Sequence, residues 1–440
     1  MKTNLLIFTA LLTLGLSSCL KEKTTPCEND SNNIGILSDA YWYYPMEPVY
    51  LKAEAFRSAL QIEKARKMQD PGRIYYYEDY LFVIEEGQGI HLIDNYNPHN
   101  PVNVGFIAIP GCSNMAILNN VLYADSYVDL VTLNVSSPAR PEYLNRVEDV
   151  FLNNIYYDSD QDAYLVGYRP TVPEEELPCL GVSSRADLPV MPWFKAFAFN
   201  DVAVLESNAY ADQSGGQTGI GGSMARYTIA MNHLYIVDNY SLNVFSLRIP
   251  DQPQLVNTVY VDWGIETIFP YGDKLFIGGN DGMHIMDIST PTQPAHLSTF
   301  QHATACDPVI VDGNLAYVTL RDGLECQTFS NQLDVVDVTE LTNPKLLKSF
   351  PMYNPHGLSK MGDLLMICEN DKGLKLFDAA DYATIGDKLL SQVEGFMAFD
   401  VIALPHKQTA LVIGKDGFYQ FDVSDPLNVR EVSRILAAGN

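Results

Sequence analysis

Seven polar residues stand at equivalent positions in the sequence, each just before or at the start of an apolar run that predicts a β-strand. They supply carboxylates, an imidazole, guanidinium groups and an amide, which can bind hydroxyl-bearing ligands or transfer protons. If these strands line one channel, the side chains form a ring of mixed charge at its mouth. Such a ring fits a ligand or metal site, and it equally fits the ordinary polar lining of a wet channel. The seven residues are Arg73, Asn114, Arg226, Glu266, Asp307, His356 and Asp400.

Two other groups of residues resemble parts of known metal sites but lack the remaining ligands or the required spacing. His302, Asp307 and His356 could supply nitrogen and oxygen ligands, yet they come from different repeats and match no fixed metal spacing. The run Asp158–Asp162 resembles the start of a calcium loop, whose required glycine is replaced by Ala163. No nucleophile elbow, phosphate loop or Cys-x-x-Cys pair occurs. We therefore expect no metal and no cofactor, and the motifs make no positive case for a catalyst.

The composition is that of an acidic globular protein. The 440 residues include 28 Lys and Arg against 54 Asp and Glu, which gives a net charge of −26, and no basic stripe interrupts this excess. A chain so acidic binds polyanions poorly, so nucleic acid is not an expected partner. Hydrophobic residues make up 47%, and the 29 Gly and 25 Pro indicate many short strands divided by turns.

A repeated unit accounts for the equivalent positions. An aromatic or apolar residue marks the second strand of each unit and recurs at intervals of 41, 41, 71, 41, 41, 49 and 46 residues. These residues are Phe82, Tyr123, Tyr164, Tyr235, Phe276, Tyr317, Met366 and Val412. A period of about 40 to 45 residues with four strands per unit is typical of a β-propeller. We predict an all-β propeller of eight blades over residues 71–436, or of seven if 151–222 is an insertion. In the fifth unit, the strands are expected near 267–271, 274–279, 283–288 and 295–300.

Two runs in the first unit resemble a known family. Leu81-Phe-Val-Ile84 and Ile90-His-Leu-Ile-Asp94 are similar to the LVIVD repeat of bacterial cell-surface β-propellers, and the similarity extends over residues 71–436. The resemblance implies a propeller fold and a cell-surface setting. It implies little about mechanism, because the family itself is poorly characterised.

The first residues predict export and a lipid anchor. Lys2 precedes an apolar run, Leu5–Leu14, that is too short to span a bilayer. The following Leu16–Cys19 resembles the lipobox of bacterial lipoproteins, which implies cleavage before Cys19 and acylation of that residue. An ordinary secretory signal with a chance cysteine is the alternative. Because Leu20 is not Asp, the resemblance favours the outer membrane and leaves the periplasmic or surface-facing leaflet open.

The segments before the repeats are assigned by composition. Residues 1–18 form the predicted signal peptide, and residues 19–49 form a polar tether. Residues 50–70 are the predicted N-terminal helical segment, because Leu51–Met68 is rich in helix formers with apolar residues on one side. We expect this helix to pack against the side of the propeller, although a helix that binds a partner is the alternative.

Meander connectivity divides the loops of a propeller between two faces. Turns between the second and third strands share one face with the links from each fourth strand to the next unit, and we call this the top face. Insertions at 169–192 and 208–223 both map there and are expected to overhang the channel mouth. Loops held by a rigid scaffold carry binding groups, so the functional surface is predicted on this face.

Six cysteines remain besides Cys19, and an even number in an exported chain permits disulfides. Cys306 and Cys326 both belong to top-face loops of the sixth unit, so we predict that they form a disulfide. Cys368 lies in an apolar strand and is expected to be a buried thiol. The connectivity of the other cysteines stays open, since six allow 15 pairings.

Together these features predict a binding module anchored to the membrane by lipid. Its top face would bind a glycan, a peptide or an envelope protein. The alternative is a hydrolase or lyase at the channel mouth that acts on a carbohydrate or another small polar substrate. The fold alone does not choose between them.

The lipid anchor can be tested directly. Cys19→Ser removes the predicted acylation site, so the variant should move from the membrane pellet to the soluble fraction after export. Fractionation and immunoblotting would measure this. Continued membrane association of the variant would contradict the lipobox interpretation.

Overall fold

The computed structural model describes residues 45–152, 155–172, 177, 184, 188, 190–192, 207–208, 218–301, 308–321 and 331–438. The chain divides into two compact units, and the larger one, Glu47–Arg169 with Val190–Asn440, contains the repeats. In the smaller one, Met1–Met46 with Pro170–Pro189, the amide of Thr171 donates to the carbonyl of Pro45 at 2.8 Å. None of the helices found in these ranges is both long and apolar enough to cross a membrane.

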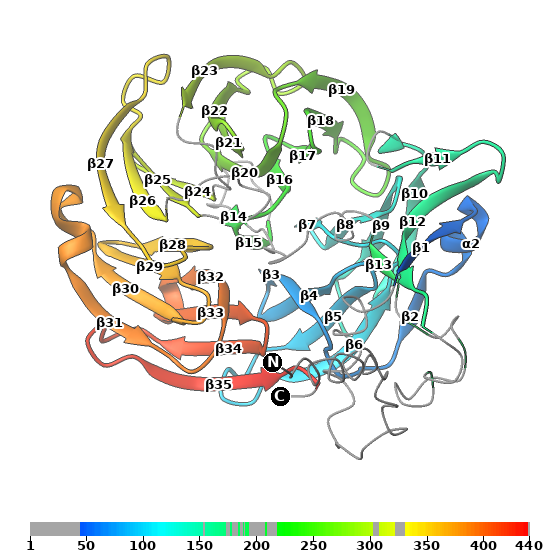
Figure 1. The fold of residues 1–440 in the computed structure, drawn as a ribbon, viewed down its shortest axis with the longest axis horizontal. Coiled ribbons are helices and arrows are strands. Elements are labelled where there is room, and N and C mark those ends of the chain that lie inside the picture. Colours follow the sequence, from blue (N-terminus) through cyan, green and yellow to red (C-terminus); the bar gives the residue numbers. More distant parts are fainter. Residues whose placement is uncertain are drawn as a thin grey trace, which may run out of the picture. The chain divides into compact units, whose positions relative to one another are not determined.

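Seven of the repeats form four-stranded antiparallel meanders (Figure 1). The first and second repeats are β3 (Pro71–Tyr77), β4 (Tyr80–Glu85), β5 (Gly89–Asp94) and β6 (Val102–Ala108), then β7 (Met115–Leu118), β8 (Val121–Ser126), β9 (Asp129–Asn134) and β10 (Glu142–Val147). The fourth and fifth are β16 (Tyr227–Ala230), β17 (His233–Val237), β18 (Ser241–Ser246) and β19 (Gln254–Tyr260), then β20 (Ile265–Tyr271), β21 (Lys274–Gly279), β22 (Gly282–Asp287) and β23 (Ala295–Gln301).

The last three repeats continue the same order of strands. The sixth is β24 (Val309–Asp312), β25 (Leu315–Leu320), β26 (Gln332–Asp337) and β27 (Lys345–Pro351). The seventh is β28 (Leu358–Met361), β29 (Leu364–Cys368), β30 (Leu374–Asp378) and β31 (Leu389–Val393), with the 3-10 turn η4 (Tyr382–Asp387). The eighth is β32 (Ala398–Leu404), β33 (Thr409–Gly414), β34 (Gly417–Asp422) and β35 (Arg430–Leu436), with η5 (Pro405–Lys407). The predicted all-β propeller is confirmed, and each marker residue lies in the second strand of its unit.

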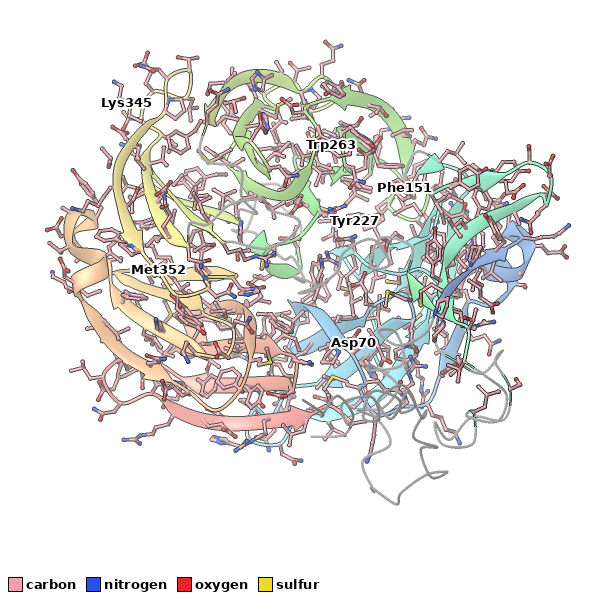
Figure 2. All side chains as sticks on the ribbon, viewed as in Figure 1. Asp70, Phe151, Tyr227, Trp263, Lys345 and Met352 are labelled. Atoms are coloured by element: carbon pink, nitrogen blue, oxygen red, sulfur yellow. The ribbon has the colours of Figure 1, made fainter. Side chains whose placement is uncertain are left out.

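The described strands of the third repeat lie outside the ring. Its strands β11 (Tyr157–Asp158), β12 (Ala163–Pro170) and β13 (Met191–Pro192) form a separate sheet with β1 (Met46–Leu51). The inner strands of the second and fourth units, β7 and β16, contact each other directly. Phe151 fills this junction, with its ring centroid 6.4 Å from that of Tyr227 and 6.2 Å from that of Phe245 (Figure 2).

Among the described residues, therefore, seven blades form the ring, and the preferred ring size of eight is corrected to the alternative of seven. Apolar residues of neighbouring blades pack into shared clusters, so the second and fourth units bury their faces against each other without an intervening sheet. The expectation that Tyr164 and the run 193–199 share one blade falls partly outside the described residues.

The first and last blades close the ring through side chains. Ile74, Leu81, Ile402 and Leu411 belong to one buried cluster that spans the two blades. The buried amides of Asn95 and Gln420 exchange hydrogen bonds of 2.9 and 2.7 Å. The four meander strands of each of these two blades come from one continuous segment, so the blades share no strand, and side-chain packing and hydrogen bonds close the ring.

The N-terminal helix is present but shorter than expected. Helix α2 (Ala53–Ser58) buries Phe56 against Tyr127 and Tyr164 at ring distances of 5.2 and 6.0 Å, so it packs against the propeller as predicted. The predicted continuation to Met68 is wrong. After α2, strand β2 (Gln61–Glu63) pairs with β6, because the outer edge of that blade offers unpaired backbone groups.

The second excursion enters the channel. Strands β14 (Ser207–Asn208) and β15 (Ile220–Ser223) extend the inner side of the first blade, where Ile220 pairs with Tyr76. The amide of Gly219 donates to the carbonyl of Ile117 at 2.9 Å, and β15 also contacts β28 and β32. The expectation that 208–223 only overhangs the mouth is therefore corrected for its described part: the inner edge of β3 accepts a further strand, which occupies the channel.

Candidate functional site

Six of the seven residues of the predicted ring are described, and each lies at or next to the start of an inner strand. Arg73, Glu266 and Asp400 lie in β3, β20 and β32, and the other three directly precede or closely adjoin such strands. Asp307 lies outside the described residues, as do His302, Cys179, Cys306 and Cys326, so the predicted disulfide also falls there. Of the other cysteines, Cys368 is a buried thiol as expected, and Cys112 is buried as well.

Two arginines and several carboxylates share the top of the channel. Arg226 is partly buried and donates from Nη1 to Asn239 Oδ1 at 3.3 Å. Burial lowers the pKa of Arg226, while the nearby Glu266 opposes this shift and Arg73 reinforces it. Arg73 pairs with Glu86 at 3.4 Å and donates to the carbonyl of Ser113. The positive charges of the ring thus face carboxylates of this chain.

Asp400 and the hydrogen bonds around it link β15 to the seventh and eighth blades. Its Oδ1 accepts hydrogen bonds from the Ser223 hydroxyl at 3.1 Å and the Ser223 amide at 3.4 Å. The Ser223 hydroxyl in turn accepts a bond of 2.7 Å from the Leu358 amide. A Cβ atom on Gly357 would lie 1.9 Å from Asp400 Oδ1, so the close approach requires glycine there. This carboxylate joins β15, β28 and β32.

Asn114 belongs to a turn organised by Asp125. The Asp125 carboxylate accepts bonds from the Ser113 amide at 2.7 Å, the Ser113 hydroxyl at 2.5 Å and the Asn114 amide at 2.8 Å. The Asn114 side chain donates to the Ser113 hydroxyl at 2.8 Å. Asp125 fixes the link into the second blade, and its carboxylate was not singled out by the sequence.

His356 is held as a neutral imidazole. Its amide donates to the Cys368 carbonyl at 2.8 Å, and its carbonyl accepts from the Thr319 hydroxyl at 2.8 Å. Neither ring nitrogen has a hydrogen-bond partner among the described residues. Burial lowers the pKa of His356 well below its ordinary value, and the charge of Arg321 lowers it further.

Little free volume remains between β15 and the inner strands β3, β7 and β16. A cavity lined by Tyr75, Ile117, Gly219 and Tyr227 has a volume of about 10 Å³. That is about the minimum that holds one water molecule. The inner side of the first two blades is therefore packed by the chain itself.

A larger cavity lies on the opposite, bottom face. It measures about 390 Å³, and among its lining residues are Tyr76, Asp79, Ile220, His406 and Lys407. The Tyr76 hydroxyl donates to Asp79 at 2.8 Å, and Lys407 forms an ion pair with Asp79. The sequence placed the functional surface on the top face and gave no expectation of a cavity here. The cavity arises because the first residues of β15 lie next to turns of the first and last blades. No local sequence pattern predicts that these distant segments lie together.

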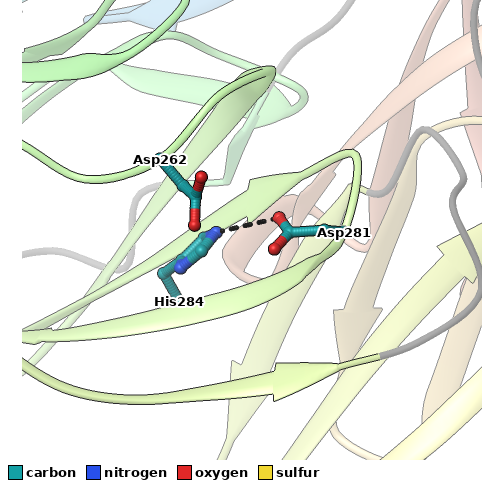
Figure 3. Close-up of side chains that lie close together, drawn as sticks. All are labelled: Asp262, Asp281 and His284. Atoms are coloured by element: carbon teal, nitrogen blue, oxygen red, sulfur yellow. Dashed lines mark ion pairs between the residues drawn. The ribbon is translucent and has the colours of Figure 1, made fainter.

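One group of side chains could hold a metal ion. Asp262, Asp281 and His284 present ligand atoms that all lie within 4.8 Å of one another (Figure 3). Asp262 lies in the link before the fifth blade, and Asp281 lies in the hairpin turn that leads to His284. The sequence marks Asn280–Gly282 as a hairpin turn and gives no sign that the preceding link would approach it.

Comparisons with known proteins support the fold alone. No protein-family model matches the sequence, and no curated protein matches it. A solved protein from Lactobacillus plantarum is 14% identical with a TM-score of 0.52, covering 83% of this chain and 96% of that one. The periplasmic gluconolactonase PpgL of Pseudomonas aeruginosa is 12% identical with a TM-score of 0.51, covering 84% and 97%.

The neutral state of His356 predicts how stability depends on pH. His356 in the unfolded chain binds a proton with a pKa of about 6.5, whereas burial holds the pKa of folded His356 well below that value, so the free energy of unfolding falls as pH drops below about 6.5. His356→Gln removes this contribution. Between pH 7.5 and 5.5, urea denaturation should show the variant losing less stability than the wild type, by at most about 1.4 kcal/mol. Equal losses would mean that folded His356 accepts the proton.

Proposed function

We propose that this protein is a lipid-anchored propeller of the outer membrane that binds a partner through its top face. The observation that carries the proposal is the occupation of the channel by β15. A catalyst at the channel mouth needs free polar groups and a cavity that takes up a substrate. Here the strand contributed by the chain itself occupies the position where a substrate would enter.

The polar ring supports the same reading. Asp400 accepts hydrogen bonds from Ser223, and Arg73 pairs with Glu86. The cavity between β15 and the inner strands β3, β7 and β16 is about 10 Å³, whereas pockets for small molecules measure roughly 300–1,000 Å³. The described ring residues therefore stabilise the centre of the propeller, and binding is left to the loops above them.

Those loops expose aromatic side chains. Trp263, in the link before the fifth blade, is 61% exposed, and its ring centroid lies 5.0 Å from that of Tyr240. Tyr353, in the link before the seventh blade, is 51% exposed, and Lys372 Nζ lies 4.8 Å from its ring centroid. Exposed Trp and Tyr are the residues that most often anchor a partner, because they offer large rigid surfaces with polar tips.

The backbone beneath both aromatic residues is fixed. Asp262 accepts a hydrogen bond of 2.7 Å from the Trp263 amide. Buried Glu369 accepts bonds from the amides of Tyr353 and Asn354 at 2.9 and 3.2 Å, and Lys375 neutralises it at 3.3 Å. Anchors held in this way lose little conformational freedom on binding.

The charge of the protein limits the partner. A net charge of −26 disfavours polyanions, while aromatic faces beside carboxylates suit hydroxyl groups and neutral rings. A glycan or an envelope protein of neutral or basic surface meets these conditions. The outer membrane anchor would hold the protein where such partners occur.

A hydrolase or lyase acting on a carbohydrate or another small polar substrate is the second candidate. The similarity of fold to PpgL favours it only at the level of the fold. The bottom-face cavity of about 390 Å³ is large enough for a small ligand. It lies on the face opposite Trp263 and Tyr353, so one experiment can separate the two candidates.

Site-specific photocrosslinking tests the proposal. Benzoylphenylalanine placed at Trp263 or Tyr353 should capture a partner in intact cells. The same group at Tyr96, which is 82% exposed in a bottom-face loop, is the matched control and should capture none. Trp263→Ala should weaken binding of the captured partner by about 2 kcal/mol, or roughly thirtyfold.

Capture at Tyr96 but not at Trp263 or Tyr353 would contradict a top-face function. Turnover of gluconolactone or of an envelope carbohydrate by the purified protein, abolished by a substitution in the bottom cavity such as His406→Ala, would favour the second candidate.

A further inference from the structure

Three potential ligands converge on the top face between the fourth and fifth blades. Asp281 Oδ1 lies 3.4 Å from His284 Nε2, and Asp262 approaches the same nitrogen from the preceding link (Figure 3). For bonds of about 2.1 Å to a metal, two ligands of a tetrahedral site lie roughly 3.4 Å apart. The observed separation therefore suits two ligands of one ion.

Backbone hydrogen bonds fix the two carboxylates in this arrangement. The Asn280 amide, next to Asp281, donates to the carbonyl of Gly264 at 3.0 Å. The Gly264 amide donates to the carbonyl of Asn239 at 2.8 Å. The link that carries Asp262 is thus bound to the hairpin that carries Asp281.

His284 is oriented by its other ring nitrogen. Its Nδ1 lies 3.0 Å from the Thr299 hydroxyl, which itself lies 3.0 Å from His296 Nε2. With Nδ1–H donating to Thr299 and the hydroxyl donating to His296, the lone pair of Nε2 faces the carboxylates. A metal-binding histidine is commonly fixed in this way through its second nitrogen.

The ring of His284 is buried with its open nitrogen directed at the acidic pair. Its side chain is 2% exposed, and Nε2 has no hydrogen-bond partner among the described residues. With the proton on Nδ1, Nε2 and the two carboxylates direct only lone pairs at one point, which is unfavourable unless a cation lies there.

We propose that Asp262, Asp281 and His284 bind one divalent transition-metal ion, with Zn²⁺ as the best match. The nitrogen ligand disfavours Ca²⁺ and Mg²⁺, which take oxygen ligands. Three protein ligands leave a coordination position open, and Asp281 is 47% exposed, so the ion would face solvent beside Trp263. This inference does not depend on the proposed binding function.

Zinc titration of the tag-free, chelator-treated protein tests the site. Calorimetry should give one equivalent of Zn²⁺ per chain, with Ca²⁺ bound at least a hundredfold more weakly. Asp281→Asn keeps the side-chain shape and should weaken Zn²⁺ binding at least tenfold. Thr299→Val, which removes the partner of Nδ1, should weaken it about ten- to hundredfold.

The matched control is Asp273→Asn, an exposed aspartate in the same blade that should leave the affinity unchanged. Circular dichroism would show that each variant is folded. Absence of zinc binding by the folded wild type would overturn the proposal, as would equal affinities of the Asp281→Asn and Asp273→Asn variants. If nitrogen NMR shows that His284 Nε2 still carries a proton in excess Zn²⁺, this nitrogen is not a metal ligand. It would then form a simple ion pair with Asp281 instead.

Discussion

The pairing of β15 with the inner edge of β3 determines how the rest of the molecule can function. Inner strands of a propeller direct unpaired backbone groups toward the axis, and here Ile220 and Gly221 satisfy those of Tyr76 and Tyr75. The same strand brings Ser223 to Asp400. One backbone interaction therefore places a strand in the channel and engages a carboxylate of the polar ring. In the function proposed above, the top-face loops are then the surface that binds a partner.

One packing requirement explains why the described strands of the third repeat lie outside the ring and how the ring closes. Each blade must bury both faces, and Phe151 lets the second and fourth units do so directly. The third repeat then packs outside with α2, where Phe56 covers Tyr164. At the seam between the first and last blades, the paired amides of Asn95 and Gln420 satisfy polar groups that would otherwise be costly to bury.

Features encoded within one repeat could be predicted from the sequence. The fifth unit illustrates this, since β20 to β23 match the expected ranges to within two residues, and Cys368 is buried as expected. Features that join distant segments could not be predicted. The meeting of Ser223 with Asp400 spans 177 residues, and the approach of Asp262 to His284 depends on how a link folds back onto a hairpin. The residues after Ser58 favour a helix by composition, but Gln61–Glu63 instead form a strand that pairs with the edge of β6.

Hydrogen exchange across residues 218–223 tests the central claim most directly, because a strand that fills the channel must be protected from solvent. The amide of Gly219 donates to Ile117, and β15 is paired with β3, so this segment should exchange as slowly as β3 itself. Exchange as fast as that of the exposed loop around Tyr96 would contradict the account. The channel would then be open, and its polar ring would be available to a substrate.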